Sequence, residues 1–179
     1  MDQEKDEQIM SKLQQGETQA LGLLFERYKT IMLNYFIRMA GDYDTAGDLL
    51  MTVFERVFKY RMSYSGQSKF RSWLFQIGNN VLKDYWRKQK RESRRLDETT
   101  EAISLDADIS EEQQMKYKML HSALEQLPIN EKNRVTLHYL MEMNYEEIAA
   151  LEGISTNAAR ISVHRGLKKL NELLKNSGI

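Results

Sequence analysis

Residues 144–170 constrain the fold more than any other stretch, because they predict two helices around a tight turn. Asn144 and Glu147 have the spacing of a capping box at the start of the first helix. Gly153 ends that helix, since glycine adopts the left-handed C-terminal geometry at little cost. Ser155 is placed to cap the second helix. The segment therefore predicts a helix-turn-helix unit.

The second of these helices has an apolar side and a polar side. The apolar side follows steps of four, three and four and consists of Ala159, Val163, Gly166 and Leu170. At about 100° per residue, the opposite side gathers Asn157, Arg160, Ile161, His164 and Lys168. Arginine suits guanine, asparagine suits adenine, and an aliphatic group suits a thymine methyl in the major groove. A helix-turn-helix puts its second helix there. The pattern favours a DNA-reading helix over its alternative, an αα-hairpin with a solvated charged face.

Charge is balanced over the whole chain but not along it. Lys plus Arg number 26 and Asp plus Glu number 26, so the total predicts no partner. Residues 69–95 carry nine basic and two acidic side chains, whereas residues 96–114 carry seven acidic and no basic ones. Adjacent blocks of opposite sign suggest a nucleic-acid surface followed by a solvated tether.

Several kinds of site are missing from the sequence. No cysteine is present, which excludes disulfides and thiolate metal sites and fits a cytoplasmic chain. The three histidines lie on separate predicted helices without zinc-site spacing, and no glycine-rich phosphate loop occurs. The N-terminus has no signal sequence, and no apolar run nears the roughly 18 residues that span a bilayer. We therefore expect no catalytic residues, no metal, no cofactor and no membrane insertion.

Apolar periodicity predicts helices throughout the chain and no strand. The expected helices cover residues 18–39, 48–60, 69–91, 110–126 and 130–141, followed by the helix-turn-helix. Residues 62–68 form a polar loop around Gly66. The predicted fold is all-α, with small helical domains at 1–95 and 111–179 joined by a flexible acidic linker at 96–110.

The predicted helix 69–91 has two different faces. One face is a candidate core and holds Phe70, Trp73, Leu74, Ile77 and Val81. The other mixes aromatic, amide and basic groups and holds Phe75, Asn79, Leu82, Lys83, Trp86 and Lys90. Rings and cations together suit unstacked bases and their phosphates. A helix packed on both sides with a solvated basic end fits equally well. The helix before it could line a partner's groove or simply belong to the core.

Taken in order, these segments resemble a bacterial sigma factor of the ECF (extracytoplasmic function) subfamily, a subunit that gives RNA polymerase its promoter specificity. Residues 20–28 are similar to the opening of sigma region 2, and residues 46–54 to its polymerase-binding helix. Residues 70–80, with Asp84 and the basic run 87–95, resemble the helix that recognises and melts the −10 element. Similarity to region 4, which reads the −35 element, is carried by residues 127–128, 145–149, 153–155 and 165–170.

The resemblance implies three sets of site residues and three partners. The −35 set is Asn157, Arg160, Ile161, His164, Arg165, Lys168 and Lys169. The −10 set is Tyr64, Ser68, Lys69, Arg71, Asn79, Asn80, Lys83, Trp86 and Arg87. The polymerase-binding set is Asp48, Leu49, Met51, Thr52, Phe54 and Glu55. The implied partners are core RNA polymerase through its β′ coiled coil, promoter DNA and an anti-sigma factor.

The sequence departs from the family pattern at three places. Glu, Gln and Glu are usual where this chain has Gly47, Met51 and Thr52, so its contact with polymerase is expected to differ. Arginines are common where it has Asn79 and Ser162, so the preferred promoter of relatives does not transfer to this chain. Two alternatives stay open: a helix-turn-helix regulator with an N-terminal dimerisation or ligand domain, and a sigma-like decoy that does not initiate transcription.

Overall fold

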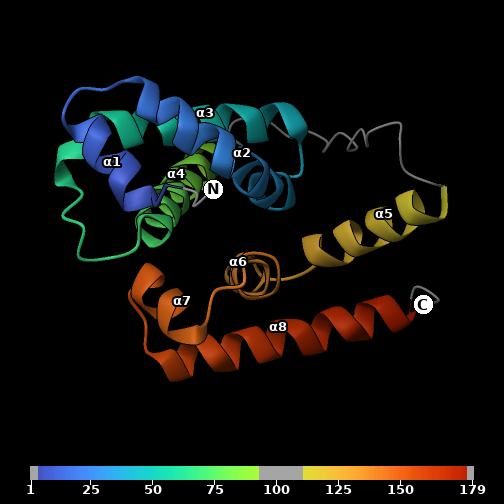
Figure 1. Ribbon diagram of the computed structural model, residues 1–179. Helices are drawn as coiled ribbons and strands as arrows, with labels where there is room; N and C mark the ends of the chain where they lie inside the picture. The colour runs from blue at the N-terminus through green and yellow to red at the C-terminus, as the bar shows by residue number, and fades with distance from the viewer. Residues whose placement is uncertain (1–3, 93–110, 177–179) are drawn as a thin grey trace. The chain divides into compact units, whose positions relative to one another are not determined.

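The computed structural model describes residues 4–92 and 111–176, and every regular element in that part of the chain is helical (Figure 1). The predicted all-α class is confirmed. The elements are α1 (Asp6–Gln14), α2 (Gln19–Ala40), α3 (Tyr43–Lys59), the 3-10 helix η1 (Arg61–Ser63), α4 (Phe70–Glu92), α5 (Glu111–Glu125), α6 (Ile129–Tyr139), α7 (Tyr145–Glu152) and α8 (Thr156–Asn176). The predicted linker, residues 96–110, lies outside the described residues.

Helix positions agree with the sequence patterns except at the N-terminus. Helix α3 begins at Tyr43, before the expected stretch 48–60, so that Asp44 lies within its first turn. Helix α1 is not predicted at all, although its Ile9, Met10 and Leu13 are buried. Those three apolar residues share one side of the helix, but they are outnumbered by polar neighbours. A nine-residue helix with that composition gives a weak periodic signal.

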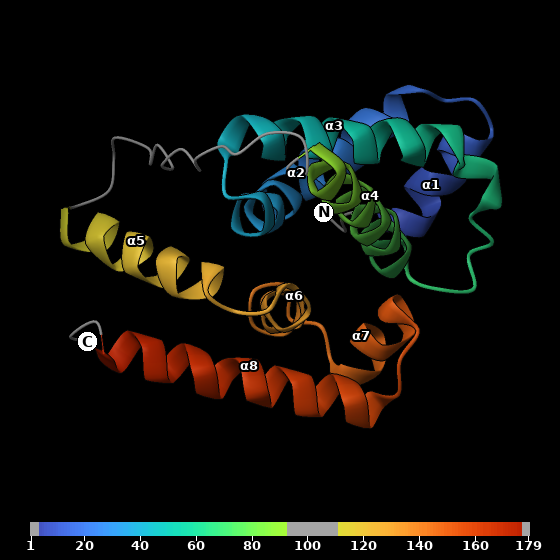
Figure 2. The ribbon, with the colours of Figure 1, turned by 180° about the vertical axis from the view of Figure 1, so that it is seen from behind.

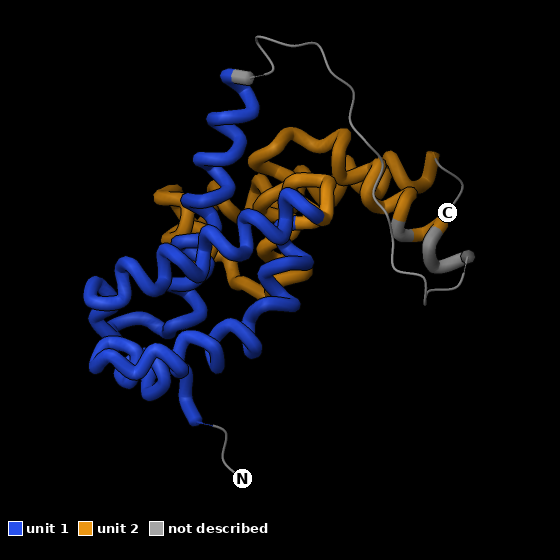
Figure 3. Tube along the Cα trace, turned by 90° about the horizontal axis from the view of Figure 1, so that it is seen from above, with its two compact units in different colours: residues 1–36, 44–101 blue, residues 37–43, 102–179 orange. Residues whose placement is uncertain are grey.

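The chain divides into two compact units, which Figure 3 colours separately. Unit 1 comprises residues 1–36 and 44–101, and unit 2 comprises residues 37–43 and 102–179. The domain limits expected from the sequence fall partly in 93–110 and stay a prediction. Each unit is described below by itself.

Helix α4 is packed on two sides in unit 1. At Gly78 it passes so close to α2 that an added Cβ would lie 2.7 Å from Cε of Met32 and 3.6 Å from Cζ of Phe36. Next to this crossing, the ring of Phe75 meets that of Tyr35 edge-on, with centroids 6.0 Å apart. Helix α2 thus covers the side of α4 opposite the predicted core.

Of the two interpretations left open for this helix, packing on both sides is the one observed over its first half. Phe75, Asn79 and Leu82 are at most 1% exposed, because α2 packs over them. The candidate core face of this helix is partly confirmed. Phe70, Leu74 and Val81 are buried, whereas Trp73 and Ile77 are half-buried. Helical periodicity identifies two faces correctly here but does not tell which of them is covered.

Helix α8 is the central helix of unit 2, against which the others pack. Helices α5, α6 and α7 each contact it, with α7 at its N-terminal end and α6 crossing between α7 and α5 (Figures 1 and 2). An added Cβ at Gly166 would lie 2.8 Å from Cγ2 of Val135 and 3.4 Å from the carbonyl oxygen of Glu131. Only glycine lets α6 approach this closely.

A buried polar network joins α6, α7 and α8. Arg134 donates from Nε to Oε2 of Glu152 at 2.6 Å and from Nη1 to Oγ of Ser162 at 2.8 Å. Asn133 donates to the other oxygen of Glu152 at 2.9 Å. Ser162, only 7% exposed, therefore faces α6. Position 162, where the resemblance leads us to expect an arginine, therefore lies in the interior and not on the outward side of α8.

We predict that Gly166→Ala destabilises unit 2 by about 1–3 kcal/mol, because the new methyl overlaps a stiff valine and backbone. Urea unfolding followed by circular dichroism measures the loss. Tryptophan fluorescence should not move, because both tryptophans, Trp73 and Trp86, lie in unit 1.

Gly47→Ala in α3 is the matched control. A Cβ at Gly47 has no heavy atom within 4 Å, so this exchange should stabilise by about 0.5–1 kcal/mol through helix propensity. Equal effects of the two substitutions would show that the α6–α8 contact is looser than its geometry indicates.

Ser162→Arg, which inserts the side chain common in relatives, should cost unit 2 at least about 2 kcal/mol. The guanidinium would enter a packed site beside Arg134 with no carboxylate left to pair with it. The same exchange at the adjacent Ile161, which is 48% exposed, should change stability by less than about 0.5 kcal/mol. A stable Ser162→Arg protein that binds DNA more tightly would mean that position 162 reaches the groove.

Candidate nucleic-acid interface

The turn between α7 and α8 is held by the residues that predict it. Asn144 Oδ1 accepts from the amide of Glu147 at 2.8 Å, and the carboxylate of Glu147 accepts from the amide of Asn144 at 2.9 Å. Gly153 has φ of 71°, in the left-handed region. Ser155 Oγ accepts from the amide of Ala158 at 3.2 Å. The predicted capping box, C-terminal glycine and second cap are all confirmed.

Helix α8 separates its two sides as the spacing predicts. The predicted inner residues Ala159, Val163, Gly166 and Leu170 are buried. All seven residues of the predicted −35 set are exposed, namely Asn157, Arg160, Ile161, His164, Arg165, Lys168 and Lys169. With 21 residues α8 is roughly 31 Å long at about 1.5 Å per residue, enough to lie in a major groove.

Two polar contacts on α8 orient side chains of this outward face. Arg160 Nη2 donates to Oδ1 of Asn157 at 2.8 Å, which holds the guanidinium beside the N-terminal turn. Arg165 lies 3.8 Å from the carboxylate of Glu131 but remains 70% exposed, so it is available to a phosphate. The face therefore offers one oriented amide–guanidinium pair and additional cations.

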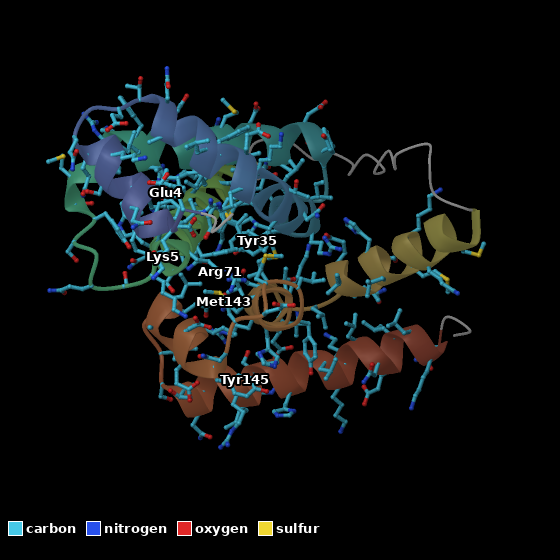
Figure 4. All side chains as sticks on the ribbon, in the orientation of Figure 1. Glu4, Lys5, Tyr35, Arg71, Met143 and Tyr145 are labelled. Carbon is cyan, nitrogen blue, oxygen red and sulfur yellow. The ribbon has the colours of Figure 1, made fainter. Side chains whose placement is uncertain are left out.

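Aromatic rings support the start of α7. His138 is stacked on Tyr145 at a centroid distance of 4.6 Å and an interplanar angle of 19°. Its Nδ1 is hydrogen-bonded to the carbonyl oxygen of Met143 at 2.8 Å (Met143 and Tyr145 are labelled in Figure 4). Tyr145 in turn lies 6.4 Å from the ring of His164 on α8. This contact between α6, α7 and α8 is not apparent from the sequence, since the three rings are far apart along the chain.

In unit 1, the loop after η1 packs on a cluster of aromatic rings. Tyr64, which the sequence suggests as a ring for an unstacked base, is only 6% exposed. Its ring lies 5.3 Å from that of Trp73 and 6.0 Å from that of Phe70. Its hydroxyl donates to the carbonyl oxygen of Ser68 at 2.7 Å, and burial raises the pKa of Tyr64. Tyr64 is thus a structural support of the loop and not its stacking surface.

The remaining predicted −10 residues divide by exposure. Asn79 is 1% exposed, so its side chain is not available to DNA at this surface. Exposed members are Ser68, Lys69, Asn80, Lys83 and Arg87, and half-buried members are Arg71 and Trp86. The loop itself exposes Met62, which is 70% exposed, together with Ser65, Gly66 and Gln67. A loop and a basic helix thus form one edge of unit 1.

A side chain outside the predicted sets holds this loop. Gln14, the last residue of α1, donates from Nε2 to the carbonyl oxygens of Arg61 and Tyr64, both at 2.8 Å. The sequence gives no sign of this contact, because the residues are about 50 positions apart and α1 is itself not predicted.

The predicted polymerase-binding residues of α3 are also divided by packing. Leu49 and Phe54 are 7% and 4% exposed, so they belong to the core and are wrong as contact residues. Asp48, Met51 and Glu55 are exposed, and Thr52 is half-buried with its hydroxyl donating to the carbonyl oxygen of Asp48 at 2.8 Å. The exposed side of α3 also includes Tyr43 and Phe58, at 54% and 37% exposed. It keeps the mixed acidic and apolar character of the sequence set, with Tyr43 and Phe58 in place of Leu49 and Phe54.

Two other kinds of site were sought in the described ranges. Within residues 4–92 and 111–176, no group of three or more His, Cys, Asp or Glu side chains could hold a metal ion. No helix in those ranges is both long and apolar enough to cross a bilayer.

Comparison with known proteins identifies both halves of the chain. The family model described as Sigma-70 region 2 matches residues 24–92, and that described as Sigma-70, region 4 matches residues 117–170. The RNA polymerase sigma factor CarQ of Myxococcus xanthus is 32% identical over 165 residues, 92% of this chain and 95% of CarQ. The ECF RNA polymerase sigma factor SigM of Bacillus subtilis is 31% identical over 157 residues, 87% of this chain and 95% of SigM.

Solved structures have the same fold. The sigma factor RpoE of Bartonella quintana, in complex with the anti-sigma factor NepR, superimposes with a TM-score of 0.72 at 23% identity, covering 85% of this chain and 96% of RpoE. CnrH, in complex with the cytosolic domain of CnrY, gives a TM-score of 0.75 at 20% identity over 96% of this chain and 97% of CnrH. On the two family matches and the two relatives, the chain belongs to the sigma-70 family and is an RNA polymerase sigma factor of the ECF subfamily, acting in transcription initiation.

Proposed function

We propose that the outward face of α8 reads the −35 element in the major groove, while unit 1 captures the opened non-template strand at −10. The observation that carries the proposal is the division of α8. Every residue that the sequence predicts to pack inward is buried, and every predicted DNA contact is left exposed. Arg160 and Asn157 supply groups that recognise guanine and adenine edges, and Arg165, Lys168 and Lys169 supply phosphate contacts.

The −10 proposal depends on the exposed part of the earlier set. With Tyr64 and Asn79 buried, a captured base has to be received by the exposed loop residues around Gly66. Lys69, Lys83 and Arg87 are left to follow the phosphates. Base recognition in this unit then comes from loop shape and backbone groups more than from rings.

The exposed side of α3 is our candidate for the β′ coiled coil of polymerase. Asp48 and Glu55 supply the acidic character of such a contact, whereas Met51 makes its centre apolar. We expect this mixed surface to bind more through apolar burial and less through charge than that of relatives with three polar residues there. Gly47 leaves an open position beside it.

The proposed role needs no chemistry from this chain, because polymerase supplies the catalysis. It also locates the chain in the cytoplasm, where bacterial polymerase and chromosome are found. The solved structures of RpoE and CnrH are complexes with NepR and with the cytosolic domain of CnrY. By analogy, we propose that an anti-sigma factor holds this chain until a signal releases it.

Replacing Arg160 with alanine should cost roughly 1–3 kcal/mol at one −35 base pair and relax the preference there. Promoters are first mapped by transcription of genomic DNA with the reconstituted holoenzyme. Binding of the holoenzyme to duplexes carrying each base at each −35 position then gives the effect. Asn171→Ala, an exposed change farther along α8, should leave the profile intact. A uniform loss on all duplexes would assign Arg160 to a phosphate.

Strand opening tests the second half of the proposal. A triple change of Met62, Ser65 and Gln67 to alanine alters the exposed loop but keeps the buried Tyr64. The holoenzyme should still bind the −35 duplex yet lose permanganate reactivity of thymines around −10, because an unstacked base costs a few kcal/mol without a pocket.

The matched control changes three exposed residues elsewhere in unit 1, Gln15, Gln19 and Thr30, to alanine. Opening should survive it. If the loop variant opens promoters as well as the control does, the loop is only a connector. If the wild-type holoenzyme binds its mapped sites and never opens them, a decoy role replaces initiation.

A further inference from the structure

Helix α1 is fixed firmly to the rest of unit 1. Asp6 is bonded to Arg27 and to the hydroxyl of Tyr28, both on α2. Burial and the hydrogen bond to Asp6 raise the pKa of Tyr28, so its hydroxyl remains a donor at neutral pH. Glu7 accepts from the amide of Phe70 at 3.2 Å, where α4 begins. The helix therefore lies in a defined place relative to both ends of the loop that precedes α4.

Gln14 extends from the C-terminal end of this anchored helix to that loop. Its two 2.8 Å hydrogen bonds go to carbonyl oxygens at the two ends of η1. These belong to Arg61, its first residue, and to Tyr64, the residue that follows it. One side chain thus bridges the beginning and end of a turn. Past Tyr64, the residues from Ser65 to Lys69 are exposed. The conformation of this exposed part therefore depends on how residues 61–64 are held.

Both protons of the Gln14 side-chain amide are used in these two hydrogen bonds. A carboxamide can donate two hydrogen bonds from one nitrogen, which a carboxylate or thioether cannot do. A loop that is held before binding loses less conformational entropy when a ligand orders it. The amide of Gln14 therefore acts on binding through the loop, without touching the DNA.

We propose that Gln14 is a positioning residue for −10 strand capture, holding loop 61–68 in the shape that receives an unstacked base. This inference rests on the proposed function of the loop. It adds α1, an element outside the matched region 2 residues, to the machinery of promoter opening.

Two substitutions separate the hydrogen bonds from the bulk of the side chain. Gln14→Met keeps a long, neutral side chain but donates nothing, whereas Gln14→Lys keeps donors on a chain of similar length. Each is paired with the same change at the neighbouring Gln15, whose amide is exposed and bonded only locally, to Ser11 at 3.3 Å. The pairing matches both composition and charge.

The measurement is binding of each holoenzyme to a fluorescent single-stranded −10 oligonucleotide from a mapped promoter, with a −35 duplex as a second probe. Gln14→Met should bind the single strand roughly tenfold more weakly than Gln15→Met, since binding must then order the loop. Gln14→Lys should restore most of that affinity relative to Gln15→Lys. Binding to the −35 duplex should be the same for all four proteins.

Equal single-strand affinity of Gln14→Met and Gln15→Met overturns the inference. So does a loss in Gln14→Met that extends to the −35 duplex or to holoenzyme formation, because that marks general damage to unit 1. The loop variant at 62, 65 and 67 is measured in parallel. If it binds the single strand normally, the proposed function of the loop has failed; if it is weak and Gln14→Met is not, only the role of Gln14 has failed.

Discussion

The close approach of α6 to α8 at Gly166 determines which side of α8 is left for DNA. Val135 and the backbone of Glu131 lie where a side chain would otherwise project, so α8 can present only its opposite side. Each outward residue then follows from helical geometry, since 100° per residue links Gly166 to Asn157, Arg160 and Lys168. The reading face is a consequence of packing on the other side of the same helix.

Two ion pairs with a buried member link α6 to its neighbours. Lys132, 2% exposed, pairs with Glu125 of α5, which is 48% exposed, and Arg134 pairs with Glu152 of α7, which is 7% exposed. Such pairs contribute little net stability, but the buried charge is costly to leave without its partner. They therefore favour one register of the helices over its neighbours. Ser162 is joined to the second pair by its hydrogen bond from Arg134. Because its side chain is buried, a difference between Ser162 and arginine at this position affects packing and not only a contact with DNA.

Local signals and tertiary packing were unequally predictable from the sequence. Caps at Asn144 and Ser155 and the two sides of α8 were predicted correctly, because each depends on residues within one or two turns. The burial of Tyr64 and Asn79 was not, because periodicity along one helix does not show what packs against it; the ring of Tyr64 contacts those of Phe70 and Trp73 across the turn into α4. Periodicity marks an amphipathic helix but not whether a second helix covers its other face. Helix α1 was missed for a related reason: its importance lies in contacts 47 to 63 residues away.

The two proposed DNA surfaces differ in the same way: one depends on local sequence signals and the other on tertiary packing. In the proposed function, helix α8 reads a duplex that is already formed, so rigid side chains on a rigid helix suffice, and its residues can be found by spacing. Capture of an opened strand has to stabilise bases that have lost their stacking, and at the loop of unit 1 the rings of Tyr64 and Phe70 are buried while that of Trp73 is half-buried. Tyr64, Trp73 and Phe70 then act by shaping the backbone above them. Selectivity at −10 would be encoded in the packing of unit 1 as a whole, which makes it harder to transfer between relatives than the reading face of α8.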